Sequence, residues 1–226
     1  MKLSVGRIFL IVGVLSFSVM IMAGYVYFDQ RTNNQPPQLS KAETSNIIRE
    51  NEEDIFKRSD DPVLGNPNGD VTLVEFFDYR CTYCKLVHPV VMTLLKEDGN
   101  IRYVAKEYPI LGPVSTLASQ AALASQIQGK YAAYSNALMA AKSLGDDQIF
   151  AIAKDVGLDP IRLLDDIDAH EEDINAKISG TIALAKTLAL KGTPAFIIGD
   201  QLIPGAVSKA NLELLIAKAR SNNRKD

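Results

Sequence analysis

The sequence contains little cysteine, little histidine and no tryptophan. Among 226 residues there are 2 Cys, 2 His and 0 Trp, and 27 acidic residues face 24 basic ones, which gives a formal net charge of −3. Two cysteines cannot build a disulfide framework, and the balanced charge provides no basic surface, so we expect no nucleic-acid partner. The 47% of hydrophobic residues is typical of a globular domain and excludes a disordered or collagenous chain.

Residues 1–28 differ in composition from the rest of the chain. Residues 8–28 carry no charged side chain, Lys2 and Arg7 precede them, and Asp29 follows. A run of this length can cross about 30 Å of hydrocarbon as a helix, so we expect an uncleaved membrane anchor. A cleaved secretory signal is the alternative. In either case the basic residues stay in the cytoplasm and the rest of the chain lies outside it.

A polar stretch at residues 29–61 follows this run. Its first part contains Pro36-Pro37 among polar side chains, which is typical of a stalk. Apolar residues at helical spacing then predict an amphipathic helix at 45–57. The apolar stripe either packs on its own domain or pairs with a second subunit to form a homo-oligomer, and the sequence leaves both open. The stripe consists of Ile47, Ile48, Ile55 and Phe56.

Strand patterns flank the cysteine pair. A nearly continuous apolar run at 71–78 predicts a strand that is covered on both faces, and 101–108 predicts a second strand. Between them, apolar residues at helical spacing continue to Gly99. Strand, helix and strand form a βαβ-type opening, and the cysteines stand at the start of its helix.

The region from Ser115 to Lys191 has a helical pattern almost throughout. Two short strands follow it, close enough in the chain to form a hairpin, and then a last helix. The expected helices run from about 115 to 142 with a break near Gly129, from 146 to 157, from the capping residue Asp159 onward, from about 174 to Gly192, and from Ser208 onward; the expected strands are 195–198 and 201–203.

Both cysteines lie within four positions, as Cys81-Thr82-Tyr83-Cys84. Two sulfurs at this spacing at a helix start can close and reopen a disulfide with little backbone movement. The helix N-terminus favours an anion at the first sulfur, and the thiolate is the reactive form of cysteine. We therefore expect Cys81 to be the nucleophile and Cys84 to be the resolving thiol.

A metal site is the alternative use of this spacing. His88 and His170 could complete a zinc site with the pair, but they lie far apart in the chain and no second pair of close ligands exists. Copper(I) could bind the two thiolates alone, which would make the protein a copper-binding one without redox turnover. We expect no metal, and the redox-active disulfide Cys81–Cys84 is the only reactive group that the chemistry requires.

The segment from Glu75 to Lys85 resembles the active-site segment of DsbA-like thiol:disulfide oxidoreductases, in particular the bacterial ScsC-like group of the thioredoxin superfamily. Residues 192–196, Gly-Thr-Pro-Ala-Phe, resemble the cis-proline loop of that family. The resemblance implies an α/β thioredoxin fold with an inserted helical domain, preceded by the membrane anchor and the stalk helix. The implied catalytic domain spans 62–219, its helical insertion about 114–180, and the tail 220–226.

The resemblance also implies roles for individual residues. Thr193 and Pro194 belong to the catalytic site, with a cis peptide bond between them, and bind an extended segment of the substrate beside the cysteines. Glu75 takes part in proton transfer, because an acid within an apolar strand has a raised pKa. Thr82 and Tyr83 tune the redox potential, and neither is the histidine that some strongly oxidising relatives have there.

Together these expectations describe one function. The chain is expected to be a protein thiol:disulfide oxidoreductase in the periplasm, anchored in the bacterial inner membrane unless its N-terminus is cleaved, and to oxidise secreted proteins. Its partners would be unfolded or misoxidised secreted proteins and a membrane redox partner that recharges the cysteine pair. An oligomeric disulfide isomerase or reductase is the alternative within the same chemistry.

Overall fold

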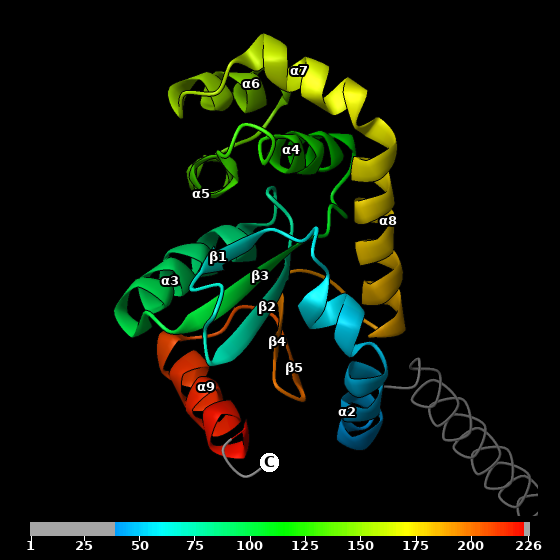
Figure 1. Ribbon diagram of the computed structural model, residues 1–226, viewed down its shortest axis with the longest axis vertical. Helices are drawn as coiled ribbons and strands as arrows, with labels where there is room; N and C mark the ends of the chain where they lie inside the picture. Colours follow the sequence, from blue (N-terminus) through cyan, green and yellow to red (C-terminus); the bar gives the residue numbers. More distant parts are fainter. Residues whose placement is uncertain (1–38, 224–226) are drawn as a thin grey trace, which may run out of the picture. The chain divides into compact units, whose positions relative to one another are not determined.

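The computed structural model describes residues 39–223, so the predicted anchor at residues 1–28 lies outside the described residues. Among the helices of residues 39–223, none combines the length and the apolar composition that a membrane crossing requires. Helices cover a central sheet and continue beyond one end of it (Figure 1). The helices are α2 (Lys41–Glu50), the π-helix η1 (Glu53–Lys57), α3 (Thr82–Asp98), α4 (Pro113–Ala124), α5 (Tyr131–Ala140), α6 (Asp146–Asp155), α7 (Pro160–Ala169), α8 (Glu171–Thr187) and α9 (Lys209–Asn223).

Five strands form one mixed sheet in the order β1-β3-β2-β4-β5. β2 and β3 run in parallel at its centre and are joined by α3, as the βαβ pattern predicts, and the other neighbouring pairs are antiparallel. The side chains of β2 and β3 are almost all buried because helices cover both faces. The strands are β1 (Val63–Gly65), β2 (Val71–Phe77), β3 (Ile101–Glu107), β4 (Ala195–Ile198) and β5 (Gln201–Pro204).

Two sets of helices pack on the two faces of the sheet. α3 and α9 contribute to the core on one face, together with Leu73 and Phe196 of the sheet. α2, η1 and α8 contribute to the core on the other face, together with Phe76 and Val104. Figure 1 shows these two sets on opposite sides of the strands. The arrangement leaves the end of β2, where the cysteines follow, next to the helices inserted between β3 and β4.

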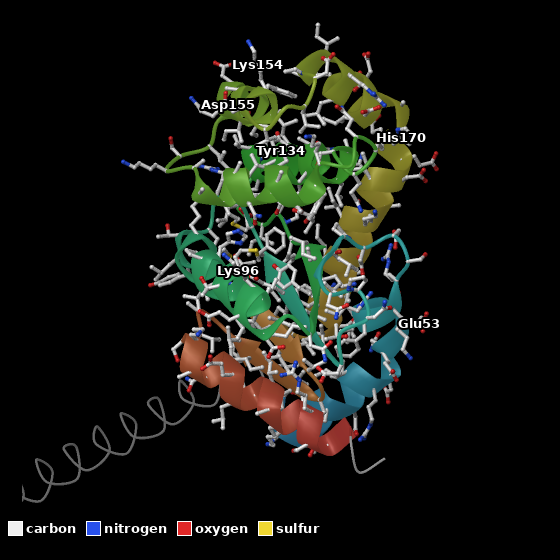
Figure 2. The ribbon with its side chains drawn as sticks, turned by 60° about the vertical axis from the view of Figure 1, so that its left-hand side comes forward. Glu53, Lys96, Tyr134, Lys154, Asp155 and His170 are labelled. Carbon is white, nitrogen blue, oxygen red and sulfur yellow. The ribbon has the colours of Figure 1, made fainter. Side chains whose placement is uncertain are left out.

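The insertion consists of α4 to α8. The helix expected from 115 to 142 is broken, as predicted, near Gly129, which has a positive φ of 65° between α4 and α5. Tyr134 of α5 is buried within this helical layer and donates a hydrogen bond to the Ile149 carbonyl at 2.8 Å (Figure 2). Asp159 caps α7 with its side chain, as predicted.

The apolar stripe predicted at residues 45–57 packs on the chain's own sheet. Ile48 and Ile55 expose 2% and 0% of their surface and belong to the same core as α8. Of the two alternatives that the sequence leaves open, the structure therefore shows the intramolecular one. An oligomer through these side chains would require the segment to leave the sheet.

The prediction of one helix at 45–57 was wrong, because α2 ends at Glu50 and the short π-helix η1 follows it. Two cations of β3 bind carbonyls of η1. Lys106 donates a hydrogen bond to the Asp54 carbonyl, and Arg102 donates one to the Phe56 carbonyl at 2.7 Å. These bonds satisfy carbonyls at the end of the segment that a regular helix would leave unpaired.

Other boundaries also differ from the sequence prediction. The strand β1 was not expected, because its three residues carry no periodicity and depend on pairing with β3. α8 ends before Gly192, since Ala189 takes a positive φ of 53°. α9 continues past residue 220, where Arg220 forms an ion pair with Asp98 of α3 at 2.6 Å, so the predicted tail begins inside a helix.

Candidate active site

The cysteine pair lies where β2 ends and α3 begins. The turn between them closes with a hydrogen bond from the Cys81 N–H to the Asp78 carbonyl at 3.0 Å. Cys81 then takes the N-cap position of α3 with an extended backbone, φ −72° and ψ 117°. Both Cys81 and Cys84 are free thiols, so the structure shows the reduced pair.

The Cys81 sulfur has two backbone contacts. It accepts a hydrogen bond from the Cys84 N–H at 3.4 Å, and its thiol donates one to the Thr193 carbonyl at 3.2 Å. The first contact places the sulfur at the N-terminus of α3. The side chain exposes only 7% of its surface, so a reacting sulfur has narrow access to it.

Cys84 lies one turn further into α3 and has no exposed surface. Burial raises the pKa of the Cys84 thiol far above its usual range, and the charge of Glu75 raises it further. Cys84 is therefore a neutral thiol at physiological pH, whereas Cys81 stands at the helix terminus. The two environments differ in the way that an attacking and a resolving thiol require.

The predicted cis-proline loop lies opposite Cys81. The Thr193–Pro194 peptide bond is cis, as the sequence resemblance implied. β4 begins directly after it, and the Pro194 carbonyl accepts a hydrogen bond from the Gly205 N–H at 2.8 Å. The fold thus brings Thr193 into contact with Cys81, although they are 112 positions apart in the chain.

Glu75 lies inside β2 with 1% of its surface exposed. Its Oε2 accepts a hydrogen bond from the Tyr103 hydroxyl at 2.8 Å, whereas its buried Oε1 has no hydrogen-bond partner in the described part of the chain. Burial raises the pKa of Glu75 to about 8, and the bond from Tyr103 offsets part of the rise. Such a carboxyl exchanges a proton near neutral pH, and it interacts electrostatically with Cys84.

The two residues between the cysteines lie on the outer side of the first turn of α3. Thr82 and Tyr83 are exposed, and Tyr83 exposes 64% of its surface. Leu86, one turn further along, exposes 66%. These side chains are open to contact by another protein chain.

Sequence reasoning missed Asp78. Its buried carboxylate accepts hydrogen bonds from the N–H groups of Arg80, Ile110 and Leu111 and from the Ser115 hydroxyl, at 2.7 to 3.0 Å. Asp78 thereby fastens the turn before Cys81 to the loop that leads into α4. The only signal in the sequence is an acid that directly follows an apolar strand.

Two further polar contacts join α3 to α5. Lys85 donates a hydrogen bond to the Leu138 carbonyl at 2.8 Å, and burial lowers the pKa of its amine. The Nε2 of His88 lies 2.8 Å from Oδ1 of Asn136. Within residues 39–223 no three His, Cys, Asp or Glu side chains gather in a way that could hold a metal ion.

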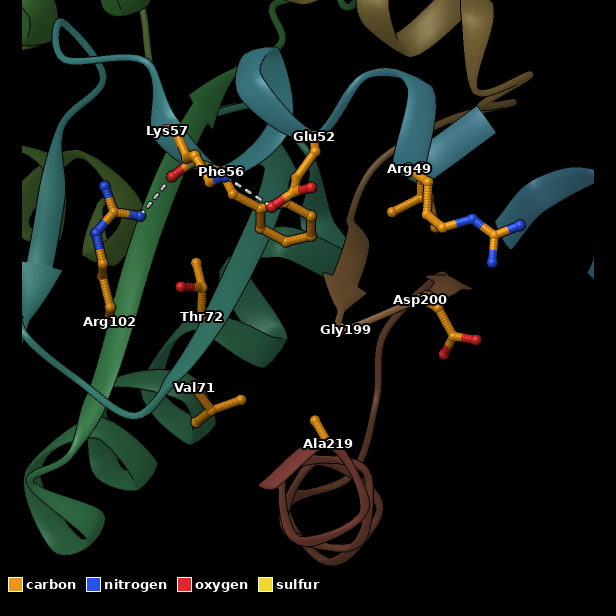
Figure 3. Close-up of a pocket in the computed structure, with 11 residues that line it drawn as sticks. Arg49, Glu52, Phe56, Lys57, Val71, Thr72, Arg102, Gly199, Asp200 and Ala219 are labelled. Atoms are coloured by element: carbon orange, nitrogen blue, oxygen red, sulfur yellow. Dashed lines mark hydrogen bonds and ion pairs between the residues drawn. The ribbon is translucent and has the colours of Figure 1, made fainter. Parts of the chain in front are cut away.

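A cavity of about 710 Å³ lies near the beginning of β2, away from the cysteines. It is lined by β2, α2, η1 and α9, and Figure 3 shows Arg102 at its side, hydrogen-bonded to the Phe56 carbonyl. No thiol lines this cavity. We therefore place the candidate chemistry at Cys81 and Cys84.

Most of the chain is similar to known proteins. A family model described as thioredoxin matches residues 57–218. A thioredoxin-like oxidoreductase from Silicibacter pomeroyi is 42% identical, and the match covers 76% of this chain and 98% of that one with a TM-score of 0.73. The thiol-disulfide exchange protein alpha-DsbA2 from Wolbachia pipientis is 31% identical, with 81% and 99% covered and a TM-score of 0.76. The catalytic domain of Proteus mirabilis ScsC is 26% identical, with 78% and 98% covered and a TM-score of 0.72.

The first curated relatives that the chain matches are longer proteins. A Na⁺/H⁺ antiporter NhaA 1 from Salinispora arenicola is 28% identical over 169 residues, which are 73% of this chain and 25% of that protein. The chain thus spans about a quarter of the length of the first curated relatives that it matches. The family match, the similar exchange proteins and the paired thiols at the start of α3 agree with one another. The chain belongs to the thioredoxin family and is similar to DsbA-like thiol-disulfide exchange proteins.

Proposed function

We propose that the chain is an extracytoplasmic disulfide oxidase that transfers its Cys81–Cys84 disulfide to secreted proteins. The observation that carries the proposal is the position of the Cys81 sulfur, which accepts the Cys84 N–H at the N-terminus of α3 beside the Thr193 carbonyl. These contacts stabilise the reduced sulfur more than a disulfide sulfur. A stabilised reduced form makes the corresponding disulfide a stronger oxidant.

The exchange converts two client thiols into one client disulfide and reduces the disulfide of the enzyme. A client thiolate attacks the Cys81 sulfur of the closed disulfide, forms a mixed disulfide and expels the Cys84 sulfur. A second client thiolate then attacks the client sulfur of the mixed disulfide, closes the client disulfide and expels Cys81. Two electrons pass to the enzyme, and a membrane redox partner would remove them again. No group besides the cysteine pair is needed as a cofactor.

Glu75 would supply the proton for the leaving Cys84 sulfur. With its pKa of about 8, the Glu75 carboxyl is largely protonated at neutral pH, and a charged Cys84 thiolate would be costly at a buried position. Proton transfer from Glu75 neutralises this sulfur as it leaves. The reverse transfer prepares Cys84 to close the disulfide again.

Exposed apolar side chains on two segments next to Cys81 suit unfolded clients. Tyr83 and Leu86 expose 64% and 66% of their surface on α3. Ile110 and Leu111 expose 40% and 44% on the loop that is hydrogen-bonded to the active-site turn. Unfolded or misoxidised secreted proteins present apolar segments that folded proteins bury, so we propose them as the clients.

The isomerase or reductase alternative uses the same residues but gains most from an oligomer that surrounds the client. The apolar stripe at residues 45–57, one alternative use of which was to join subunits, covers the chain's own sheet, with Ile55 fully buried. This packing favours the oxidase within the proposal.

Residues 1–28 would anchor the chain in the bacterial inner membrane, with the catalytic domain in the periplasm. An exchange enzyme that donates disulfides requires a compartment in which disulfides persist. The location of the cysteine pair can be tested with a thiol reagent that does not cross the inner membrane, which should label reduced Cys81 in intact cells.

The variant Cys84→Ser tests the exchange step. Without the resolving thiol, Cys81 is expected to accumulate mixed disulfides with secreted proteins, which electrophoresis resolves and a reductant releases. The matched variant Cys81→Ser keeps only the fully buried Cys84 and should trap no client. Absence of trapped clients with Cys84→Ser would contradict an exchange function.

The equilibrium of the pair with glutathione tests the direction of exchange. A disulfide oxidase should have a potential closer to the value of about −120 mV for DsbA than to about −270 mV for thioredoxin. A value near that of thioredoxin would refute the oxidase and support the reductase.

A further inference from the structure

A second buried acid, Glu107, has no part in the exchange steps described above. It ends β3 with 2% of its surface exposed, and three hydroxyls donate hydrogen bonds to its carboxyl, each at 2.7 Å. Tyr79 and Tyr131 donate to Oε1, and Ser119 donates to Oε2. All three donors are buried. A satisfied buried network of this kind fixes one geometry for the elements that supply its members.

Tyr79 connects this network to the active site. It belongs to the turn that carries Cys81, whereas the other two donors belong to α4 and α5. The Tyr79 hydroxyl also lies 3.0 Å from Oγ of Ser135 in α5, and its ring packs edge-on against Phe77 with 5.3 Å between the ring centroids. The fully buried Tyr79 thus attaches the active-site turn to the inserted helices.

We propose that Glu107 is a positioning residue for thiol–disulfide exchange, because through Tyr79 it fixes the turn that places Cys81 on the N-terminus of α3. The proposal rests on the exchange function proposed for the cysteine pair. The Cys81 N–H bonds to the carbonyl of Asp78, the residue before Tyr79, so a shift of the Tyr79 backbone would move a hydrogen-bond partner of Cys81. A displaced Cys81 would weaken the 3.4 Å hydrogen bond from the Cys84 N–H to the Cys81 sulfur.

The hydrogen bond from the Cys84 N–H to the Cys81 sulfur determines whether a displaced turn makes the disulfide a stronger or a weaker oxidant. A reduced sulfur, above all a thiolate, accepts the Cys84 N–H more strongly than a disulfide sulfur does, so the bond favours the reduced pair. When Tyr79 no longer fixes the turn, the reduced pair loses part of this stabilisation. The disulfide then becomes a weaker oxidant of glutathione.

Two matched substitutions separate positioning from general stability. Tyr79→Phe and Tyr131→Phe each remove one hydroxyl that donates to the same Glu107 oxygen at the same distance, and only Tyr79 lies in the active-site turn. The equilibrium constant for oxidation of glutathione by the cysteine pair is measured on the purified full chain. Tyr79→Phe should lower this constant by about three-fold or more, and Tyr131→Phe should leave it within about two-fold of the unmodified value.

Glu107 itself is tested with two replacements. Glu107→Gln keeps an oxygen that accepts from Tyr79, so it should retain the unmodified equilibrium constant. Glu107→Leu removes the acceptor and should lower the constant as Tyr79→Phe does. If Glu107→Leu does not fold, the two tyrosine variants still decide the question.

Two results would overturn the positioning role. One is an unchanged equilibrium constant for Tyr79→Phe, and the other is an equal shift for both tyrosine variants, which would mark the network as purely structural. Either result leaves the exchange function intact as long as the unmodified chain equilibrates with glutathione. An unmodified chain that does not equilibrate with glutathione would refute the exchange function and with it the positioning role.

Discussion

Cys84 and Glu75 are two buried groups between which we propose the transfer of one proton. Burial raises the pKa of both groups, for Glu75 to about 8, and a charge on Glu75 raises that of Cys84 further. A negative charge on both groups at once would be very costly. If one of the two groups keeps a proton, this cost is avoided. The burial of both groups therefore supports the proton transfer that we propose for Glu75.

The variant Glu75→Gln is expected to reduce the pH dependence of stability. The folded chain has the higher Glu75 pKa, about 8 against 4.5, so it binds the proton more tightly than the unfolded chain does. This contribution is fully present at low pH and is lost as the pH rises towards the folded-state pKa. Urea unfolding should show the variant gaining roughly 2–4 kcal/mol over the unmodified chain between about pH 5.5 and about pH 9.

The exposed Glu97 of α3 provides the matched control for this prediction. Its side chain retains 55% of its accessibility, so the Glu97→Gln variant should follow the unmodified chain at both pH values. A stability difference for Glu75→Gln that is equal at both pH values would show that the folded chain does not hold the Glu75 proton.

At the scale of elements, the end of α8 is built from two backbone hydrogen bonds. The Leu190 N–H bonds to the Ala185 carbonyl at 2.9 Å, and the Ala189 N–H bonds to the Lys186 carbonyl at 3.0 Å, which together form a Schellman motif. Ala189 occupies the position that glycine usually takes, with φ at 53°. The Cβ of Ala189 makes this conformation costly. The motif nevertheless ends α8 before the loop that contains Thr193 and Pro194.

The variant Ala189→Gly should therefore stabilise the chain by about 0.5–1 kcal/mol, because glycine adopts a positive φ without a steric penalty. The same substitution at the exposed Ala183, inside α8, should instead destabilise it by about 1 kcal/mol. Urea unfolding of the two variants gives opposite shifts if the assignment is right. A loss of stability for Ala189→Gly would contradict it.

Elements with a local signal could be predicted from the sequence. α3, the break at Gly129 and the Asp159 cap follow from spacing or from single residues whose backbone preference decides the structure. Glu75 could be identified because an acid stands in an apolar run. The partners of Glu107 could not, because their hydroxyls come from the active-site turn, α4 and α5 and meet only in the folded chain. β1 has too few residues to carry a pattern.

At the scale of the whole molecule, the segment before β1 is part of the core. Lys106 and Asp61 form a buried ion pair between β3 and the chain that leads into β1, and their side chains expose 1% and 3%. Ile55 adds a fully buried side chain on the same face of the sheet. Residues assigned to a stalk from the sequence thus help to hold the catalytic domain together.

The variant Ile55→Ala should lower the free energy of unfolding by about 2–4 kcal/mol and leave the oligomeric state unchanged, since this side chain fills the chain's own core. The matched variant Ile182→Ala, at a position that is 41% exposed on α8, should cost much less. Unfolding in urea and light scattering of the full chain measure the two properties. Dissociation of an oligomer by Ile55→Ala would show that the segment joins subunits instead.

The two outermost strands, β1 and β5, are three and four residues long. β5 ends at Pro204, which has no N–H to donate, and α2 packs beside it. A long open strand offers unpaired backbone groups to any extended polypeptide and thereby promotes aggregation. An exchange enzyme that acts on unfolded chains, as proposed above, would meet this hazard constantly. The short sheet edges would then protect it from aggregating with its own clients.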